Sequence, residues 1–388
     1  MRVITSLNPE NGGVTEAVNQ SLLSSFDLDI SVVCFDEPDD SWILELKRRG
    51  ANVQALGRGR TSYQIHFGYL KWMIKNHKKY DLFYFDGVWQ FHVVPALLFK
   101  LLDVKYVVQP HGMLSHEVKS VNMRYIKKLI SWMLVERFIT KNASKIVFTA
   151  EEEEVSAIQS YPFPVFSSAI IPLGITGYSD LKMSTSTEFV DTIIPKLGSD
   201  KYILFLSRID KIKGIELFID SVLKNNVFDE NYVYLIVGPD STDLGSKLRK
   251  KIDVAGKTKY FAWHGMVSGS LKWDIISNAN AFILPSYHEN FGIVVAEAMS
   301  ASIPVLISDK VNINETVLRY GGGVVFENTE ISITDALFSW FNGSTDFQIE
   351  MGRCGRSCFH AEFNNERMMK SFEILFFDII SKKSFCDE

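Results

Sequence analysis

Short apolar runs alternate with longer segments of helical periodicity along nearly the whole chain. The apolar runs occupy residues 2–7, 29–35, 81–86, 105–110, 145–150 and 169–174 in the first half, and 202–208, 233–238, 259–265, 281–286, 303–308 and 322–326 in the second. Strands that are apolar on both faces and separated by helices are typical of parallel sheets covered on both sides. The predicted fold class is therefore α/β, with one doubly wound domain in each half.

Helical patterns and a polar join complete the predicted organisation. Helices are expected over 14–25, 41–49, 63–78, 120–140 and 293–301, the last of them amphipathic, and over the chain beyond Phe326. Residues 175–201 are polar and rich in Ser and Thr, as interdomain linkers are. The predicted parts are an N-terminal domain over 1–175, a linker over 176–200, a C-terminal domain over 201–365 and a final helix over 366–388. Packing of that helix against the first domain is one option.

Composition narrows the functional classes. The 388 residues are 46% hydrophobic and 22% charged, with a net charge of -5, so nothing suggests a nucleic-acid binder. No apolar run approaches the roughly 20 residues of a membrane span and no signal peptide is evident, which favours a cytoplasmic protein. Cys354, Cys358 and His360 lie close in sequence, but without a fourth ligand nearby we interpret the cysteines as structural thiols and expect no metal site.

The stretch SYHENFGIVVAEAM, residues 286–299, follows an apolar strand with an exposed turn and two carboxylates at E-x7-E spacing. Glu289 would precede the following helix, and Glu297 would lie about two turns into it. Free N–H groups at a helix start bind anions, and Gly292 permits close approach of the backbone to a ligand. A bound diphosphate would leave each carboxylate facing a different attached group. A capping Glu289 with a solvated Glu297 is the alternative that these residues leave open.

Three further strand ends carry candidate chemistry. Arg208 and Lys213 lie in a basic turn, FLSRIDKIKG, where cations are well placed for phosphates, although a solvated turn has the same composition. Gly12-Gly13 ends the first strand and allows close approach to an anion, but it matches neither a Walker loop nor G-x-G-x-x-G. His111, in PHGML, can act as a hydrogen-bonding or acid/base group, or it can be structural.

The neighbouring segment FDGVWQFH, residues 85–92, ends another strand. It could offer Asp86, Trp89 and His92 to a polar acceptor. By contrast, the run TAEEEE is interpreted as a solvated helix start, with its carboxylates at 151–154 exposed.

These motifs, in this order, resemble the retaining glycosyltransferases of the GT-B fold, specifically the large family four, glycosyl transferases group 1. The resemblance rests on NGGV, PHGML, TAEEE, IPLGI, FLSRIDKIKG, HGMV and PSYHENFGIVVAEAM, and it is strongest from Tyr202 to Phe326. It implies two Rossmann-like domains facing across a cleft, an acceptor-side domain first and a nucleotide-sugar-binding domain second. Ser207 stands where the family usually has Gly, and IPLGI replaces the commoner Ile-Pro-Asn-Gly.

The resemblance also implies a role for each matching residue. Arg208 and Lys213 would neutralise the donor diphosphate without a metal, and Glu297 would accept from the ribose hydroxyls. Glu289 would hold the transferred sugar, together with the amides of Asn290, Phe291 and Gly292. The remaining assignments are the amides of Gly12 and Gly13 at the diphosphate, Met266 and Val267 at the base, His111 at the reaction centre, and Asp86, Trp89, His92 and His116 on the acceptor side.

The implied activity is retaining, metal-independent transfer of a hexose from a UDP- or GDP-sugar to a glycan or lipid-linked glycan, as in bacterial surface polysaccharide (O-antigen, capsule or lipopolysaccharide) biosynthesis. A nucleotide-sugar epimerase on the same fold and a non-catalytic glycan-binding subunit are the alternatives. Residues 119–145 carry seven basic side chains and only one acidic, a net charge of +6, interleaved with apolar ones. This pattern suits peripheral binding to an anionic membrane surface, although an ordinary helix with solvated lysines fits it too.

Overall fold

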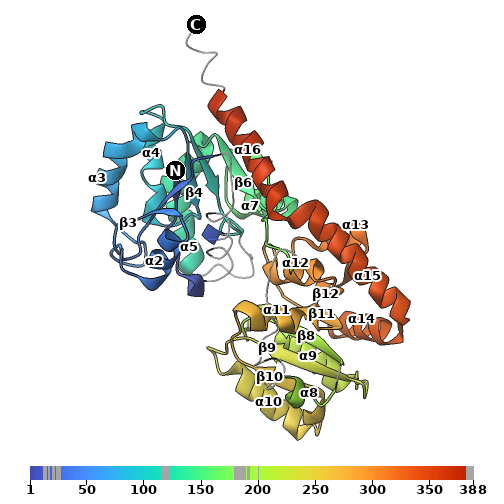
Figure 1. The fold of residues 1–388 in the computed structure, drawn as a ribbon. Helices are drawn as coiled ribbons and strands as arrows, with labels where there is room; N and C mark the ends of the chain where they lie inside the picture. The colour runs from blue at the N-terminus through green and yellow to red at the C-terminus, as the bar shows by residue number, and fades with distance from the viewer. Residues whose placement is uncertain are drawn as a thin grey trace. The chain divides into compact units, whose positions relative to one another are not determined.

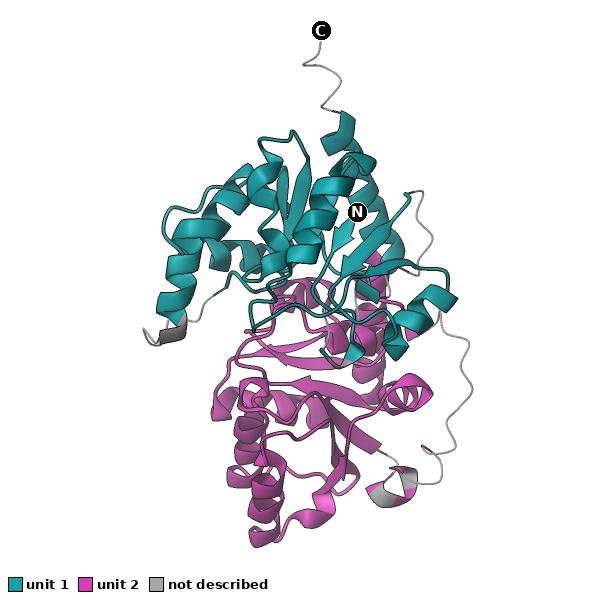
Figure 2. Cartoon of the chain, turned by 90° about the vertical axis from the view of Figure 1, so that its left-hand side faces the viewer, with its two compact units in different colours: residues 1–174, 365–388 teal, residues 175–364 magenta. Residues whose placement is uncertain are grey.

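The computed structural model describes residues 1–11, 15, 18, 19, 22, 28–115, 123–178, 189, 193–199 and 201–381. The chain forms two compact units, which Figure 2 colours separately. The first comprises residues 1–174 and 365–388, and the second comprises residues 175–364.

The first unit is built on a seven-stranded parallel sheet with the order β3-β2-β1-β4-β5-β6-β7 (Figure 1). Its strands are β1 (Arg2–Val3), β2 (Ser31–Cys34), β3 (Asn52–Ala55), β4 (Phe83–Asp86), β5 (Tyr106–Gln109), β6 (Lys145–Phe148) and β7 (Ser168–Ile170). Its helices include α2 (Ser41–Arg48), α3 (Phe67–Asn76), α4 (Ala96–Phe99), α5 (Met123–Ser131), α6 (Arg137–Asn142), α7 (Glu151–Ser160) and α16 (Asn365–Ser381), and a π-helical turn (Trp132–Glu136) joins α5 to α6.

Alternate residues of the central strands enter two different cores. Phe83, Phe85 and Phe148 pack on one face of the sheet, in the core that includes Trp132. Tyr84, Val107 and Val147 face the other way and pack against Met368, Phe372 and Ile379 of α16. The last helix is therefore the cover of one face of the first sheet, because its apolar side chains fill that core.

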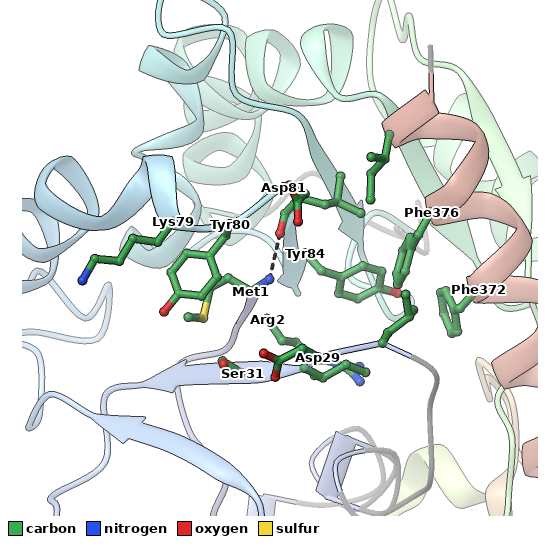
Figure 3. A pocket seen from close by; sticks show the side chains of 14 residues that line it. Met1, Arg2, Asp29, Ser31, Lys79, Tyr80, Asp81, Tyr84, Phe372 and Phe376 are labelled. Carbon is green, nitrogen blue, oxygen red and sulfur yellow. Dashed lines mark hydrogen bonds between the residues drawn. The ribbon is translucent and has the colours of Figure 1, made fainter. Parts of the chain in front are cut away.

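A cavity of about 250 Å³ lies where α16 meets the starting ends of β1, β2 and β4. Figure 3 shows the rings of Tyr84, Phe372 and Phe376 lining it. Ligands of such sheets bind beyond the carboxyl ends of the strands, at the opposite edge. We therefore regard this cavity as part of the seam between α16 and the sheet.

The second unit contains a six-stranded parallel sheet with the order β10-β9-β8-β11-β12-β13. Its strands are β8 (Lys201–Leu206), β9 (Tyr232–Val237), β10 (Phe261–His264), β11 (Ala281–Leu284), β12 (Val305–Ser308) and β13 (Gly323–Phe326). Its helices are α8 (Ile194–Leu197), α9 (Ile215–Lys224), α10 (Leu244–Val254), α11 (Gly269–Ser277), α12 (Ile293–Ser300), α13 (Asn314–Tyr320), α14 (Glu330–Asn342) and α15 (Thr345–Cys358), with a π-helical turn at Phe359–Phe363. The two sheets confirm the predicted α/β class.

Two predictions of local structure need correction. The edge strand β3 was not predicted, because its sequence NVQA buries only Val53 and carries no continuous apolar run. Helix α12 was expected to be amphipathic, yet every residue from Val295 to Ser300 is buried. A helix enclosed on all sides has no solvated face to produce a periodic pattern.

Within the described ranges, no helix is long and apolar enough to cross a membrane. Over the same ranges, no group of three or more His, Cys, Asp or Glu side chains is arranged to hold a metal ion. Cys358 is buried, and Cys386 lies outside the described residues.

Candidate functional site

The strand order of the second sheet reverses between β8 and β11. The chain leaves β8 toward β9 on one side and leaves β11 toward β12 on the other. Loops that follow two such neighbouring strands diverge, and ligands of open α/β sheets bind at this switch point. The loop at 207–214 follows β8 and the turn at 285–292 follows β11, so the basic turn and the E-x7-E turn meet at the same edge.

A glycine brings these two loops into contact. Gly214 has a φ of +69°, and a Cβ atom there would lie 1.8 Å from the carbonyl oxygen of Pro285. The amide of Tyr287 donates to the carbonyl of Ile212 at 2.8 Å. A side chain at position 214 would force the loops apart, because the atom it meets belongs to the backbone.

The two loops pair their charges. Lys213 Nζ forms an ion pair with Glu289 Oε2, and the side chains are 15% and 20% exposed. Arg208 is 64% exposed and lies 3.9 Å from Asp210. The site therefore holds one sheltered cation with a carboxylate partner and one cation open to solvent, both at the end of β8.

The turn after β11 is fixed by the loop after β12. The amide of Glu289 donates to Lys310 O at 3.0 Å, and the amide of Asn312 donates to Glu289 O at 3.1 Å. Gly292 caps α12 with a φ of +76°. The ring of Phe291 packs edge-to-face on Phe363, so only the backbone of Phe291 is available to a ligand.

Glu297 is 2% exposed, and its Oε1 lies 2.7 Å from Lys272 Nζ. The alternative of a solvated Glu297 is therefore wrong. Lys272, on α11, was not singled out from the sequence, because nothing in SLKWD indicates that it faces a carboxylate 25 residues further on. Met266 and Val267 follow β10, Met266 exposed and Val267 half-buried.

In the first sheet the order reverses between β1 and β4. Arg2 donates from Nε and Nη2 to the carboxylate of Asp86, at 2.5 and 2.8 Å. His111 Nε2 lies 2.9 Å from the same carboxylate. Burial alone would raise the pKa of Asp86, but Arg2 and His111 outweigh it and lower the pKa to about 2. Asp86 therefore stays ionised between two donors.

His111 is held by this carboxylate in an unusual backbone conformation, with a φ of +52°. If Nε2 donates to Asp86, Nδ1 is an acceptor, and it has no hydrogen-bond partner within the described residues. The side chain is 1% exposed. His111 is thus an oriented imidazole with one unused nitrogen at the end of β5.

Two acceptor-side candidates are enclosed in this structure. His92 is fully buried, and its Nε2 lies 2.9 Å from the carbonyl of Asp86. The Asp86 carboxylate is enclosed by Arg2 and His111. Both groups hold the site together, and neither side chain is exposed. Trp89 is half-buried, so part of its side chain is accessible to an acceptor. Gly12, Gly13 and His116 lie outside the described residues.

Glu153 was predicted to be solvated, and this prediction is wrong because the residue is fully buried. Its Oε2 accepts from the amide and hydroxyl of Thr149, at 2.8 and 2.7 Å, and its Oε1 accepts from the amide of Gly112. The carboxylate thus ties the start of α7 to the turn that carries His111. Because four glutamates follow one another, the sequence does not indicate which of them is buried.

His92 is expected to make the free energy of unfolding depend on pH. Burial is the main cause that lowers its pKa from 6.5 to about 4, despite the opposing attraction of Asp86. The unfolded chain then binds this proton near pH 6.5 and the folded chain does not, so stability falls as pH drops from about 6.5 toward 4. The expected loss from His92 is roughly 2 kcal/mol between pH 7 and pH 5.

Urea unfolding at both pH values tests this for the wild type and His92→Gln. The glutamine amide can still donate to Asp86 O but does not titrate. The variant should show a shallower decline with falling pH, and an equal decline in both proteins would show that His92 is not its source.

Residues 187–353 match the model of the family described as glycosyl transferases group 1. An uncharacterized glycosyltransferase of Methanocaldococcus jannaschii is 25% identical over 257 residues, covering 63% of this chain and 62% of the relative, under two thirds of its length. An uncharacterized 41.2 kDa protein in the cps region of Klebsiella pneumoniae is 22% identical over 329 residues, 82% of this chain and 83% of the relative.

Among solved structures, HepE of Anabaena, in complex with UDP and glucose, superposes with a TM-score of 0.73. It is 16% identical and covers 97% of this chain and 98% of its own. A likeness at this identity shows the fold alone, and that fold agrees with the class predicted from the sequence.

Proposed function

We propose that the chain is a group 1 glycosyltransferase of the retaining kind, which uses a nucleotide-sugar donor and needs no metal. The match of residues 187–353 to the family's model and the GT-B fold support this proposal. The acceptor is a glycan or lipid-linked glycan of bacterial surface polysaccharide biosynthesis. The relative in a cps region and the neighbour bound to UDP and glucose support this proposal.

The observation that carries the proposal is the pairing of Lys213 with Glu289 at the switch point of the second sheet. In the proposed complex the donor diphosphate lies between the basic turn and the start of α12, where Arg208, Lys213 and the first amides of the helix neutralise it. The phosphate oxygens compete with Glu289 for Lys213 Nζ. Glu289 is then free to accept hydroxyl groups of the transferred sugar.

The buried pair of Glu297 and Lys272 is proposed to receive the ribose. A carboxylate accepts from two adjacent hydroxyl groups, and the ion pair with Lys272 orients it. Met266 and Val267, at the end of β10, are proposed to flank the base. This arrangement places the nucleotide along the carboxyl ends of β10, β8 and β11.

In a retaining transfer, the new glycosidic bond forms on the face from which the diphosphate departs. The bond between the anomeric carbon and the diphosphate oxygen breaks, and the acceptor hydroxyl oxygen bonds to that carbon on the same face. The hydroxyl proton passes to an oxygen of the departing diphosphate. Lys213 and Arg208 stabilise the negative charge that grows on the leaving group, which is where preorganised electrostatics contribute most.

A thermal-shift series with UDP-, GDP-, ADP- and dTDP-sugars tests the donor claim. A matched donor at about 100 times its Kd stabilises the folded state by about 2.7 kcal/mol. The shift should be lost in the double variant Arg208→Ala/Lys213→Ala and kept in Lys224→Ala, which removes a charge from the far end of α9. Equal shifts in all three proteins would place the nucleotide elsewhere.

Peripheral membrane binding is proposed for the outward face of α5 and α6. Ile126, Ile130, Leu134 and Phe138 repeat every four residues on one side of the continuous helix, and all are exposed. Lys127 and Lys141 are exposed on the same two helices. Apolar groups flanked by cations suit the surface of an anionic bilayer.

Liposome sedimentation tests the membrane proposal. Lys127→Glu/Lys141→Glu should weaken binding to anionic vesicles, more at low salt than at high salt, because screening shortens the reach of the charges. Lys71→Glu/Lys75→Glu on α3 is the matched control. The proposal fails if both double variants sediment with the vesicles as the wild type does.

A further inference from the structure

Trp89 is held in place by the loop that carries His111. It follows β4 with a φ of +68°, a conformation that non-glycine residues rarely adopt. Its indole Nε1 donates to the carbonyl of Met113 at 2.8 Å, two residues beyond His111. Backbone strain of this kind persists where surrounding contacts impose it, and it is common at binding sites. The indole is therefore a fixed part of the His111 site.

A lysine lies over the face of this indole. Lys128 Nζ is 5.2 Å from the centroid of the Trp89 ring. The side chain is half-buried, and burial lowers the pKa of Lys128. Lys128 forms no ion pair with the described residues. Glu136, the acidic residue of the same helical segment, is buried and accepts from the hydroxyl of Ser131. Its neighbour Lys127 points to solvent.

An aromatic cluster surrounds the same indole. The ring of Tyr161 is 5.3 Å from that of Trp89, and it stacks on Trp132 and Tyr125, with ring centroids 5.0 and 6.4 Å away. Tyr161 is buried, and within the described residues its hydroxyl has no hydrogen-bond partner. Sugar sites commonly combine aromatic faces with a few oriented polar groups. This cluster provides both beside His111.

We propose that the acceptor carries an anionic group, a carboxylate or a phosphate, close to the sugar that is glycosylated, and that Lys128 binds this group above the Trp89 ring. The inference rests on the proposed glycosyl transfer, and it adds an acidic acceptor to it. A half-buried ammonium without a carboxylate partner is costly to maintain, and an anion supplied by the substrate removes that cost. A neutral glycan would leave the cation uncompensated.

The two chemical sources of the anion are separable by fluorine NMR on protein labelled with 5-fluorotryptophan. Trp89→Phe assigns the Trp89 signal, which then reports on its own surroundings without any need for turnover. The probes are glucuronic acid, glucose 1-phosphate and neutral methyl glucoside. Preference for the first indicates a uronic acid acceptor, and preference for the second indicates a phosphorylated or lipid-diphosphate-linked one.

In the wild type, at least one anionic probe should move the Trp89 signal at about tenfold lower concentration than methyl glucoside, the effect of one charge-assisted contact. Lys128→Gln should abolish this difference, Lys128→Arg should retain it, and Lys127→Gln should leave it unchanged. Equal responses to charged and neutral probes in the wild type, or equal loss in both glutamine variants, would overturn the proposal.

The same spectra distinguish a failure of the acidic-acceptor proposal from a failure of the proposed glycosyl transfer. Trp273 lies beside Lys272, within the proposed ribose site, so its signal should respond to the nucleotide sugar. A Trp273 response without discrimination at Trp89 refutes only the acidic acceptor. A silent Trp273 with every nucleotide sugar counts against the donor site itself.

Discussion

Replacing Lys213 by alanine is expected to lower kcat by about 10²–10³, the usual effect of removing one preorganised electrostatic donor. Lys213 is sheltered at the junction of two loops, and before the donor binds Glu289 fixes the position of its ammonium group. The charge on the leaving diphosphate grows as the glycosidic bond breaks, so this contact strengthens in the transition state. KM for the donor should change less than kcat.

Steady-state kinetics with the matched donor provide the measurement. Lys211→Ala is the control, because Lys211 belongs to the same turn and is exposed. Both substitutions remove one positive charge, so a general electrostatic effect would act on both. Turnover by Lys213→Ala equal to that of Lys211→Ala would contradict the assignment.

Asp86→Ala is expected to lower the free energy of unfolding by about 3–5 kcal/mol, as is usual when one partner of a buried ion pair is removed. The substitution leaves the Arg2 guanidinium without its carboxylate, and it also releases His111 Nε2. The side chain of Asp86 is fully enclosed, so water cannot replace the missing contacts at little cost.

Urea unfolding of Asp86→Ala alone and combined with Arg2→Met measures this loss. The double variant should be more stable than Asp86→Ala, since the uncompensated cation is gone. Asp39→Ala, at an exposed position, is the control and should change stability little. A loss below about 1 kcal/mol in Asp86→Ala would show that the triad of Arg2, Asp86 and His111 is not a structural anchor.

The strands and the E-x7-E turn were predictable because their signals are local. Runs such as YILFL and AFIL are apolar on both faces, and a parallel sheet requires this. The E-x7-E turn combines a strand end, a glycine with positive φ and a helix start within a few residues. The edge strand β3 lacks such a signal because solvent covers half of it.

The contacts that hold the site together were not predictable, because they join residues far apart in sequence. Arg2 meets Asp86 across 84 residues, and Gly112 meets Glu153 across 41. Lys272 reaches Glu297 from a different helix. Nothing in the local pattern of a lysine or glutamate indicates which carboxylate or amide it will find after folding.

The basic segment illustrates the same limit with two adjacent residues. From the sequence, Lys127 and Lys128 belong to one charged, amphipathic stretch, and both suggest a membrane surface. In the structure Lys127 is exposed, whereas Lys128 lies over Trp89 at the His111 site. A helical turn of about 100° per residue separates their surroundings, and only the fold shows what each side chain meets.

Proton NMR of the anomeric signal tests whether the proposed transfer from a nucleotide sugar proceeds with retention and without a metal. The wild-type protein, its matched donor and an acceptor are mixed in the presence of EDTA, and the anomeric proton of the new glycosidic linkage is observed. An α-linked donor should give an α-linked product, at a rate that EDTA does not change. A β-linked first product, or loss of transfer in EDTA, would contradict it.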